Sequence, residues 1–154
     1  MKVDNCILCK RDDAEVIFRT ELWRVLLVND PNLPGFCRVV LNEHIIEMTD
    51  LPGTRRSALM DVVWLIEQTI RDVMHPDKIN IASLGNMVPH IHWHIIPRYK
   101  DDMTFPDSIW SLPHRTINAE TLAKRQQKIA TLCNLLKTRL KERYGKPSDS
   151  IDYD

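Results

Sequence analysis

Three histidines at alternate positions, His90, His92 and His94, are the residues of this sequence best suited to chemistry. The bulky apolar residues between them favour a β-strand, which we expect to end at Pro97. Alternate side chains of a strand share one face, so the three imidazoles should form a row with Cα atoms about 7 Å apart. A buried imidazole without a hydrogen-bond partner costs about 1–3 kcal/mol, so the row is suited to an anion, a metal ion or both.

A neutral imidazole can act as a nucleophile toward phosphorus, because its reference pKa lies near 6.5. One ring nitrogen attacks while a hydrogen bond to the other holds the required tautomer. His92 has a histidine on each side, and this central position favours it as the nucleophile. The alternative interpretation is a metal-chelating or simply solvated strand.

Cys6 and Cys9 form a Cys-x-x-Cys pair, which is half of a typical zinc site. The pair alone does not distinguish metal binding from redox chemistry or chance, although the βαβ pattern expected around a redox pair does not follow. His44 and His90 are the candidates for two further ligands, which would complete a Cys2His2 tetrahedron. The alternative is a pair of reduced, metal-free thiols.

The run from His90 to Ile96 is similar to the signature of the histidine-triad (HIT) nucleotide hydrolases and transferases, in which three histidines alternate with apolar residues. The resemblance extends from about Cys6 to about Trp110 and looks closest to bacterial dinucleoside-polyphosphate hydrolase-like members. Further matching positions occur in the order that the family uses: Asn29, Pro34-Gly35, Asn42-Glu43-His44 and Gly85-Asn86.

The resemblance implies a hydrolase in which His92 attacks the α-phosphate of a dinucleoside polyphosphate. A nucleotidyl-histidine intermediate would form, and water would then release a mononucleotide. His94 would orient the phosphate and help to move a proton to the leaving group. A histidine at this position favours hydrolysis, since the transferase branch carries glutamine there.

The resemblance also implies which residues bind the substrate and the metal. Asn29 would contact the ribose hydroxyls, with Asp30 as second choice, while Asn80 and Asn86 would lie in the nucleotide site, Asn86 near a phosphate. An ordinary turn asparagine is the alternative for Asn29, and an ordinary strand-edge asparagine for Asn80. A structural zinc ion would have as its ligands Cys6, Cys9, His44 and His90. The protein would be a homodimer.

Two residues depart from the family pattern and remove side chains with which relatives contact the substrate. Phe36 stands where many relatives carry a histidine, and Met87 stands where they often carry serine or threonine. One alternative is a nucleoside phosphoramidate hydrolase, and the two departures point to another, a nucleotide-binding module with weak catalysis.

Periodicity of the apolar residues predicts the elements that must position these side chains. Besides the triad strand, we expect strands at about 14–18, 22–28, 36–41 and 78–83, and helices at about 54–74 and 118–144. This order predicts an α+β, HIT-like fold: an antiparallel sheet of about five strands with two long helices. We expect a single HIT domain over residues 1–147 and a flexible C-terminal tail of residues 148–154.

Three smaller expectations concern the remaining aromatic and sulfur-containing residues. Cys37 and Cys133 lie in apolar surroundings and should be small buried residues. The irregular segment from Phe105 to His114 should be a packed loop, with a flap or a dimer contact as alternatives. Its Trp110 is a candidate to lie near a base or phosphate.

Composition excludes several classes of partner. The 154 residues carry 21 basic and 21 acidic side chains, so no global field would hold a long nucleic acid or an acidic membrane. A small nucleotide remains compatible, because it needs only a local cluster of charge. The first residues lack the apolar segment of a signal peptide, and no apolar run reaches the roughly 18 residues of a membrane span. These features suggest the cytoplasm.

Overall fold

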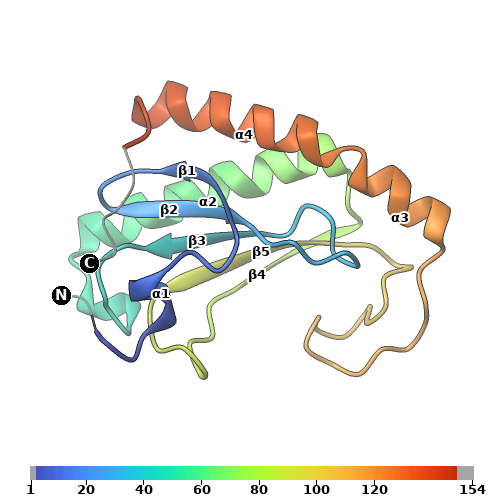
Figure 1. Cartoon of the computed structure of the whole chain (residues 1–154), viewed down its shortest axis with the longest axis horizontal. Helices are drawn as coiled ribbons and strands as arrows, with labels where there is room; N and C mark the ends of the chain where they lie inside the picture. Colours follow the sequence, from blue (N-terminus) through green and yellow to red (C-terminus); the bar gives the residue numbers. More distant parts are fainter. Residues whose placement is uncertain (1–2, 149–154) are drawn as a thin grey trace.

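Five short strands rich in valine, leucine and isoleucine pair into one antiparallel sheet in the computed structural model, which describes residues 3–148 (Figure 1). The order across the sheet is β1-β2-β3-β5-β4, and every neighbouring pair is antiparallel. The strands are β1 (Glu15–Arg19), β2 (Trp23–Leu27), β3 (Cys37–Leu41), β4 (Lys78–Ala82) and β5 (His92–Arg98). The five-stranded antiparallel sheet of the sequence prediction is confirmed.

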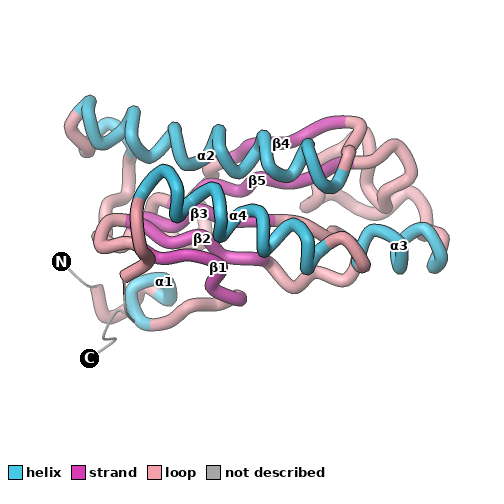
Figure 2. The backbone as a smooth tube through the Cα atoms, turned by 90° about the horizontal axis from the view of Figure 1, so that it is seen from above, coloured by secondary structure: helices cyan, strands magenta, loops and turns pink. Residues whose placement is uncertain are grey.

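Two long helices cover one face of this sheet, and within residues 3–148 the one helix on the opposite face is short (Figures 1 and 2). The covering helices are α2 (Gly53–Met74) and α4 (Ile129–Tyr144), while α1 (Ile7–Lys10) lies on the other side. A single-turn 3-10 helix, η1 (Met48–Asp50), precedes α2. None of the helices in the described range is both long and apolar enough to cross a bilayer.

The main core lies between the sheet and the two covering helices. It takes the odd-numbered residues of β3 and β5 together with one stripe of each helix, as the period of two in strands requires. Fully buried members include Val39, Ile95, Ile66, Ile70, Leu132 and Leu136. Cys37 and Cys133 are buried in the same cluster, as predicted. The histidines of β5 therefore face the side opposite α2 and α4.

The second helix of the sequence prediction is two helices, so the continuous helix expected over 118–144 is wrong. α3 (Ala119–Gln126) is capped by Asn118, whose side chain accepts hydrogen bonds from the amides of Glu120 and Thr121. The hydrogen-bond ladder is then interrupted at Lys128, whose amide donates to the carbonyl of Arg125 three residues earlier. α3 has no buried residue, whereas α4 buries four, so only α4 is held against the sheet.

Strand β5 also differs from its prediction at both ends. Pro97 does not end it, because β5 continues to Arg98 and Pro97 pairs with Ile79 of β4. The pairing with β3 stops at Ile95, so β5 is bonded on one side there, where a residue without an amide proton is tolerated. At the other end, His90 lies just before the strand rather than in it.

The expected tail of residues 148–154 lies outside the described residues except for Ser148. The amide of Ser148 donates a 2.9 Å hydrogen bond to the carbonyl of Arg19 at the end of β1. This contact attaches the segment that follows α4 to the edge strand of the sheet.

A buried ion pair fixes the irregular segment that follows β5. Arg98 and Asp102 have side chains 1% and 2% exposed, and Nε of Arg98 donates to Asp102 at 2.7 Å. The Arg98 guanidinium also donates to Asn80 and Thr104. Burial favours a raised pKa for Asp102, but Arg98 and the amides of Tyr99 and Phe105 outweigh it and lower the pKa.

Replacing Asp102 by asparagine should destabilise the fold by about 3–5 kcal/mol, because it leaves the Arg98 charge buried without its counter-ion. Urea unfolding at neutral pH measures this. Since the pKa of Asp102 is lowered by folding, its contribution is present above the ordinary value near 3.9 and is lost as the pH falls through the lowered value. Asp101→Asn is the matched control: its pair with Arg125 is half exposed, so its loss should cost less than about 1 kcal/mol. An equal loss of unfolding free energy in the two variants would contradict the special role of the buried Arg98–Asp102 pair.

Candidate functional site

The antiparallel register of β3 and β5 builds a polar row on the sheet face opposite the long helices. His92 lies opposite Val40, and His94 lies opposite Arg38. The two imidazoles are 9% and 8% exposed as residues, and their ring centroids are 4.9 Å apart. The row is thus shielded from bulk water although it lies away from the main core.

The tautomer of His92 follows from one short hydrogen bond. Its Nδ1 donates to the backbone carbonyl of His90 at 2.6 Å, so in the neutral ring the lone pair lies on Nε2. Burial lowers the pKa of His92 below its ordinary value, and the positive charge of Arg38 contributes in the same direction. At neutral pH the ring is therefore an uncharged imidazole with one free nitrogen, as nucleophilic attack requires.

His94 is enclosed by aromatic rings. The centroids of Phe36 and Trp110 lie 5.7 and 5.2 Å from that of His94. Within the described residues, Nδ1 of His94 is buried and has no hydrogen-bond partner. Burial lowers its pKa to about 3, with further contributions from His92 and Arg38. Trp110 thus contacts the histidine row, and its expected position near a base or phosphate stays a prediction.

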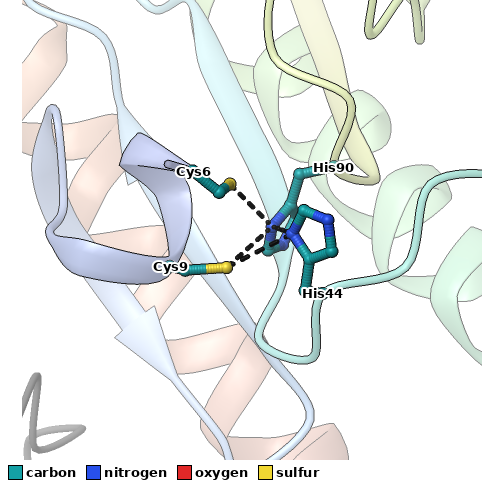
Figure 3. Close-up of side chains that lie close together, drawn as sticks. All are labelled: Cys6, Cys9, His44 and His90. Atoms are coloured by element: carbon teal, nitrogen blue, oxygen red, sulfur yellow. Dashed lines mark hydrogen bonds between the residues drawn. The ribbon is translucent and has the colours of Figure 1, made fainter. Parts of the chain in front are cut away.

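The four predicted metal ligands meet at the N-terminal end of β5 (Figure 3). α1 and the residue before it bring Cys9 and Cys6, the segment after β3 brings His44, and the segment before β5 brings His90. The four side chains point toward a common centre, and all of their ligand atoms lie within 4.8 Å of one another.

The distances in this cluster match the edges of a small tetrahedron. Nδ1 of His90 lies 3.4 Å from the sulfur of Cys6 and 3.5 Å from that of Cys9. Nδ1 of His44 lies 3.2 Å from Nδ1 of His90 and 3.3 Å from the sulfur of Cys9. Bond lengths of about 2.3 Å to sulfur and 2.0–2.1 Å to nitrogen give tetrahedral edges of about 3.3–3.6 Å between N–N and N–S pairs. The cluster therefore has the size and donor set of a zinc site.

Two further contacts orient the cluster. Nε2 of His90 donates to the carbonyl of Leu41 at 2.6 Å, which turns its Nδ1 lone pair toward the sulfurs. Burial lowers the pKa of His90 to about 4, so the ring is neutral and able to act as a ligand. The buried guanidinium of Arg24 donates to the carbonyl of Leu8, between the two cysteines, at 2.7 Å. α1 is thereby attached to the sheet.

The three predicted substrate-binding asparagines lie on three different elements. Asn29 is exposed in the segment that follows β2, and Asn86 is exposed in the loop before β5. Asn80 is half-buried in β4, where its side-chain oxygen accepts a 2.7 Å hydrogen bond from Arg98. Asn80 pairs with Ile96 and so belongs to the histidine face of the sheet. Gly85 has a φ of 69°, which supports the backbone turn expected beside Asn86.

A cavity of about 160 Å³ is lined by Asp30, the residue that follows Asn29 in the sequence. Its walls come from the loop after β2 and from the segment between Asp102 and Pro113, which contains Trp110. Its lining residues include Asp30, Leu33, Thr104 and Ile109. The cavity is smaller than the roughly 300 Å³ of a typical ligand pocket, so it would take only part of a nucleotide.

Arg38 and Asp13 were missed by the sequence interpretation. Nη1 of Arg38 donates to Asp13 at 2.6 Å, and the arginine lies beside His94 on the polar face. A signal was present, because Arg38 is the single charge within the apolar run from Phe36 to Leu41. The position of Arg38 beside His94 depends on the strand register, which the sequence alone does not give.

Comparison with known proteins identifies the family. The HIT domain family matches residues 10–101 of this chain, which is more than half of its length. The chain belongs to the HIT family. The matched segment includes the histidine row and His44 but not Cys6 and Cys9.

Curated relatives of this HIT protein include hydrolases of dinucleoside polyphosphates. The asymmetrical bis(5'-nucleosyl)-tetraphosphatase of Schizosaccharomyces pombe is 31% identical over 103 residues, which are 64% of this chain and 57% of that protein. The bis(5'-adenosyl)-triphosphatase of Saccharomyces cerevisiae is 33% identical over 94 residues, 56% of this chain and 46% of that protein. The chain thus spans about half the length of these relatives.

Solved structures of HIT proteins share the fold. A histidine triad protein from Bradyrhizobium japonicum is 29% identical with a TM-score of 0.65, covering 79% of this chain and 90% of that one. A zinc-bound histidine triad family protein from Mycobacterium smegmatis is 23% identical with a TM-score of 0.54, covering 85% and 97%. At 23% identity, the comparison with the Mycobacterium smegmatis protein shows a shared fold alone.

Acidification should weaken the fold through His94. Its pKa in the folded chain, about 3, lies below the ordinary 6.5, so its stabilisation is fully present above about pH 6.5 and is lost as the pH falls toward the folded value. Urea unfolding of the metal-free protein between about pH 7 and pH 4 measures this loss. His94→Gln should reduce the dependence of the unfolding free energy on pH, because glutamine does not titrate. An unchanged slope in that variant would contradict the burial of a neutral His94.

Proposed function

We propose that this HIT protein hydrolyses a dinucleoside polyphosphate at its α-phosphate through a nucleotidyl-histidine intermediate on His92. The observation that carries the proposal is the 2.6 Å hydrogen bond from Nδ1 of His92 to the carbonyl of His90, which leaves Nε2 as a free nucleophile. The names of the relatives from Schizosaccharomyces pombe and Saccharomyces cerevisiae support the substrate class.

The two histidines divide the chemistry between them. Nε2 of His92 attacks the α-phosphorus, a P–N bond forms, and the P–O bond to the leaving nucleotide breaks. His94 gives a proton to the departing oxygen. Its pKa of about 3 in the free protein is too low for this task, but a bound phosphoanhydride raises it because a nearby anion favours the imidazolium. Water then cleaves the P–N bond and releases the mononucleotide.

The nucleoside would lie along the cavity beside Asn29. Asn29 immediately precedes Asp30, a lining residue, and the opposite wall belongs to the segment whose Trp110 contacts His94. In this arrangement Asn29 reaches the ribose and Asn86 reaches a phosphate. Asn80 acts from β4, where its amide group remains a donor while its oxygen is held by Arg98.

A structural zinc ion would hold α1 against the start of β5. Its ligands would be the two sulfurs of Cys6 and Cys9 and the two Nδ1 atoms of His44 and His90, which leaves no open coordination position for catalysis. When bound, zinc supplies folding free energy here, not chemistry. A homodimer and a cytoplasmic location remain predictions from the family resemblance and the composition.

His92→Ala should reduce hydrolysis of diadenosine tetraphosphate by about 10³-fold or more, because it removes the nucleophile. AMP release in a steady-state assay measures the loss, and intact-mass spectrometry of rapidly quenched wild-type protein should show a nucleotidyl adduct. His75→Asn is the matched control, since His75 ends α2 in a left-handed conformation that asparagine tolerates. Substantial residual turnover in His92→Ala would rule out the nucleophile assignment.

The same assay with adenosine phosphoramidate separates the substrate classes. Faster AMP release from the phosphoramidate than from diadenosine tetraphosphate would replace the proposed substrate by one with a P–N bond. Binding of AMP without hydrolysis of either compound would make the chain a nucleotide-binding module.

Protein purified without a histidine tag should contain about one zinc per chain by elemental analysis, because four distances among the ligand atoms already fit a tetrahedral site. Cys9→Ser should lose the metal and lower the melting temperature, as should chelation of the wild-type protein. Cys133→Ala is the control for metal content. Cys133 lies in the main core and is not a ligand, so this variant should retain the metal. A zinc content near zero in the wild-type protein would remove the claim.

A further inference from the structure

A charged pair on the histidine face has no part in the reaction described above. Arg38 lies opposite His94 in the β3–β5 ladder, and its side chain is 15% exposed. Nη1 of Arg38 donates to Oδ2 of Asp13, which comes from the segment between α1 and β1, at 2.6 Å. The side chain of Asp13 is 29% exposed. The pair thus lies at the edge of the buried row.

The guanidinium of Arg38 is only partly used by this pair. Among the described residues, its Nε is buried and has no hydrogen-bond partner. A buried N–H group without a partner costs about 1–3 kcal/mol, so such an atom indicates a ligand that can satisfy it. A guanidinium has five N–H groups in a fork that fits two oxygens of one phosphate.

The surroundings of Arg38 suit an anion that reacts at the neighbouring histidines. On the same face, Nδ1 of His94 is a second buried nitrogen without a partner among the described residues. The aromatic rings of Phe36 and Trp110 contact His94, and they exclude water and so strengthen electrostatic attraction. Asp13 is a more exposed group that a phosphate can replace.

We propose that Arg38 binds a phosphate oxygen of the substrate on the histidine face, and that the phosphate takes the place of Asp13 as its counter-ion. This inference rests on the proposed function, because it places the α-phosphate beside His92. It adds a charge-neutralising residue to the site. Arg38 then stabilises the charge that develops on the phosphoryl oxygens during attack.

A purely structural role makes a different prediction. If Arg38 and Asp13 only hold the segment after α1 on the sheet, removing either partner should have the same effect. If Arg38 binds phosphate, the two substitutions should act in opposite directions, because Asp13 competes with the substrate for the same guanidinium. The two roles can therefore be separated by comparing Arg38→Met with Asp13→Asn.

Calorimetric titration of AMP and of adenosine into the wild-type protein and these variants tests the inference. Arg38→Met should weaken AMP binding by about tenfold or more, since a charge-assisted hydrogen bond is lost, while adenosine binding changes less than about twofold. Asp13→Asn should bind AMP more tightly than the wild-type protein, because the competing carboxylate is gone. Equal weakening of AMP binding in both variants, or unchanged AMP binding in Arg38→Met, would overturn the proposal.

Two further variants keep the test decisive. Circular dichroism checks that each variant folds. If Arg38→Met does not fold, Arg38→Gln replaces it, and we expect the same loss of AMP binding. Arg38→Lys keeps the charge but not the fork, so it should recover part of the AMP affinity. A wild-type protein that binds AMP but hydrolyses neither nucleotide substrate would contradict the proposed function, while the AMP and adenosine affinities would still decide the role of Arg38.

Discussion

The antiparallel pairing of β3 with β5 is the contact on which the rest of the site depends. It sets Arg38 opposite His94 and Val40 opposite His92. At the end of the same pair, the carbonyl of Leu41 accepts the hydrogen bond that orients His90. A slip of one residue would exchange the two faces of β5 and bury the imidazoles among the core residues. The apolar contacts of Val39 and Ile95 with the long helices prevent that slip.

The two faces of the sheet bury different kinds of side chain. The helical face buries aliphatic side chains and supplies the stability of the fold, while the other face holds buried histidines and arginines that need hydrogen-bond partners. Arg24 and Arg98 are each 1% exposed and are held by carboxylates and carbonyls at the two ends of this face. Between them lies the histidine row.

Much of the architecture could be predicted from the sequence, because its signals are local. The alternation around His92 predicted a strand with a histidine face, and apolar spacing predicted α2 within a residue or two. The cysteine pair and His44 were brought together as expected. The break between α3 and α4 was not predictable, since it depends on which part of the helix reaches the sheet. The pairing of Arg38 with Asp13, and that of Arg98 with Asn80, join distant parts of the sequence, which local patterns do not encode.

His90 is a member of both groups of functional side chains. Its Nδ1 faces the cysteines, its Nε2 donates a hydrogen bond to the carbonyl of Leu41, and its own backbone carbonyl accepts a hydrogen bond from Nδ1 of His92. The side chain and the backbone of one residue therefore connect the thiol cluster to the ring of His92. A displacement of either cysteine would therefore move His90 and, with it, the carbonyl that fixes the tautomer of His92.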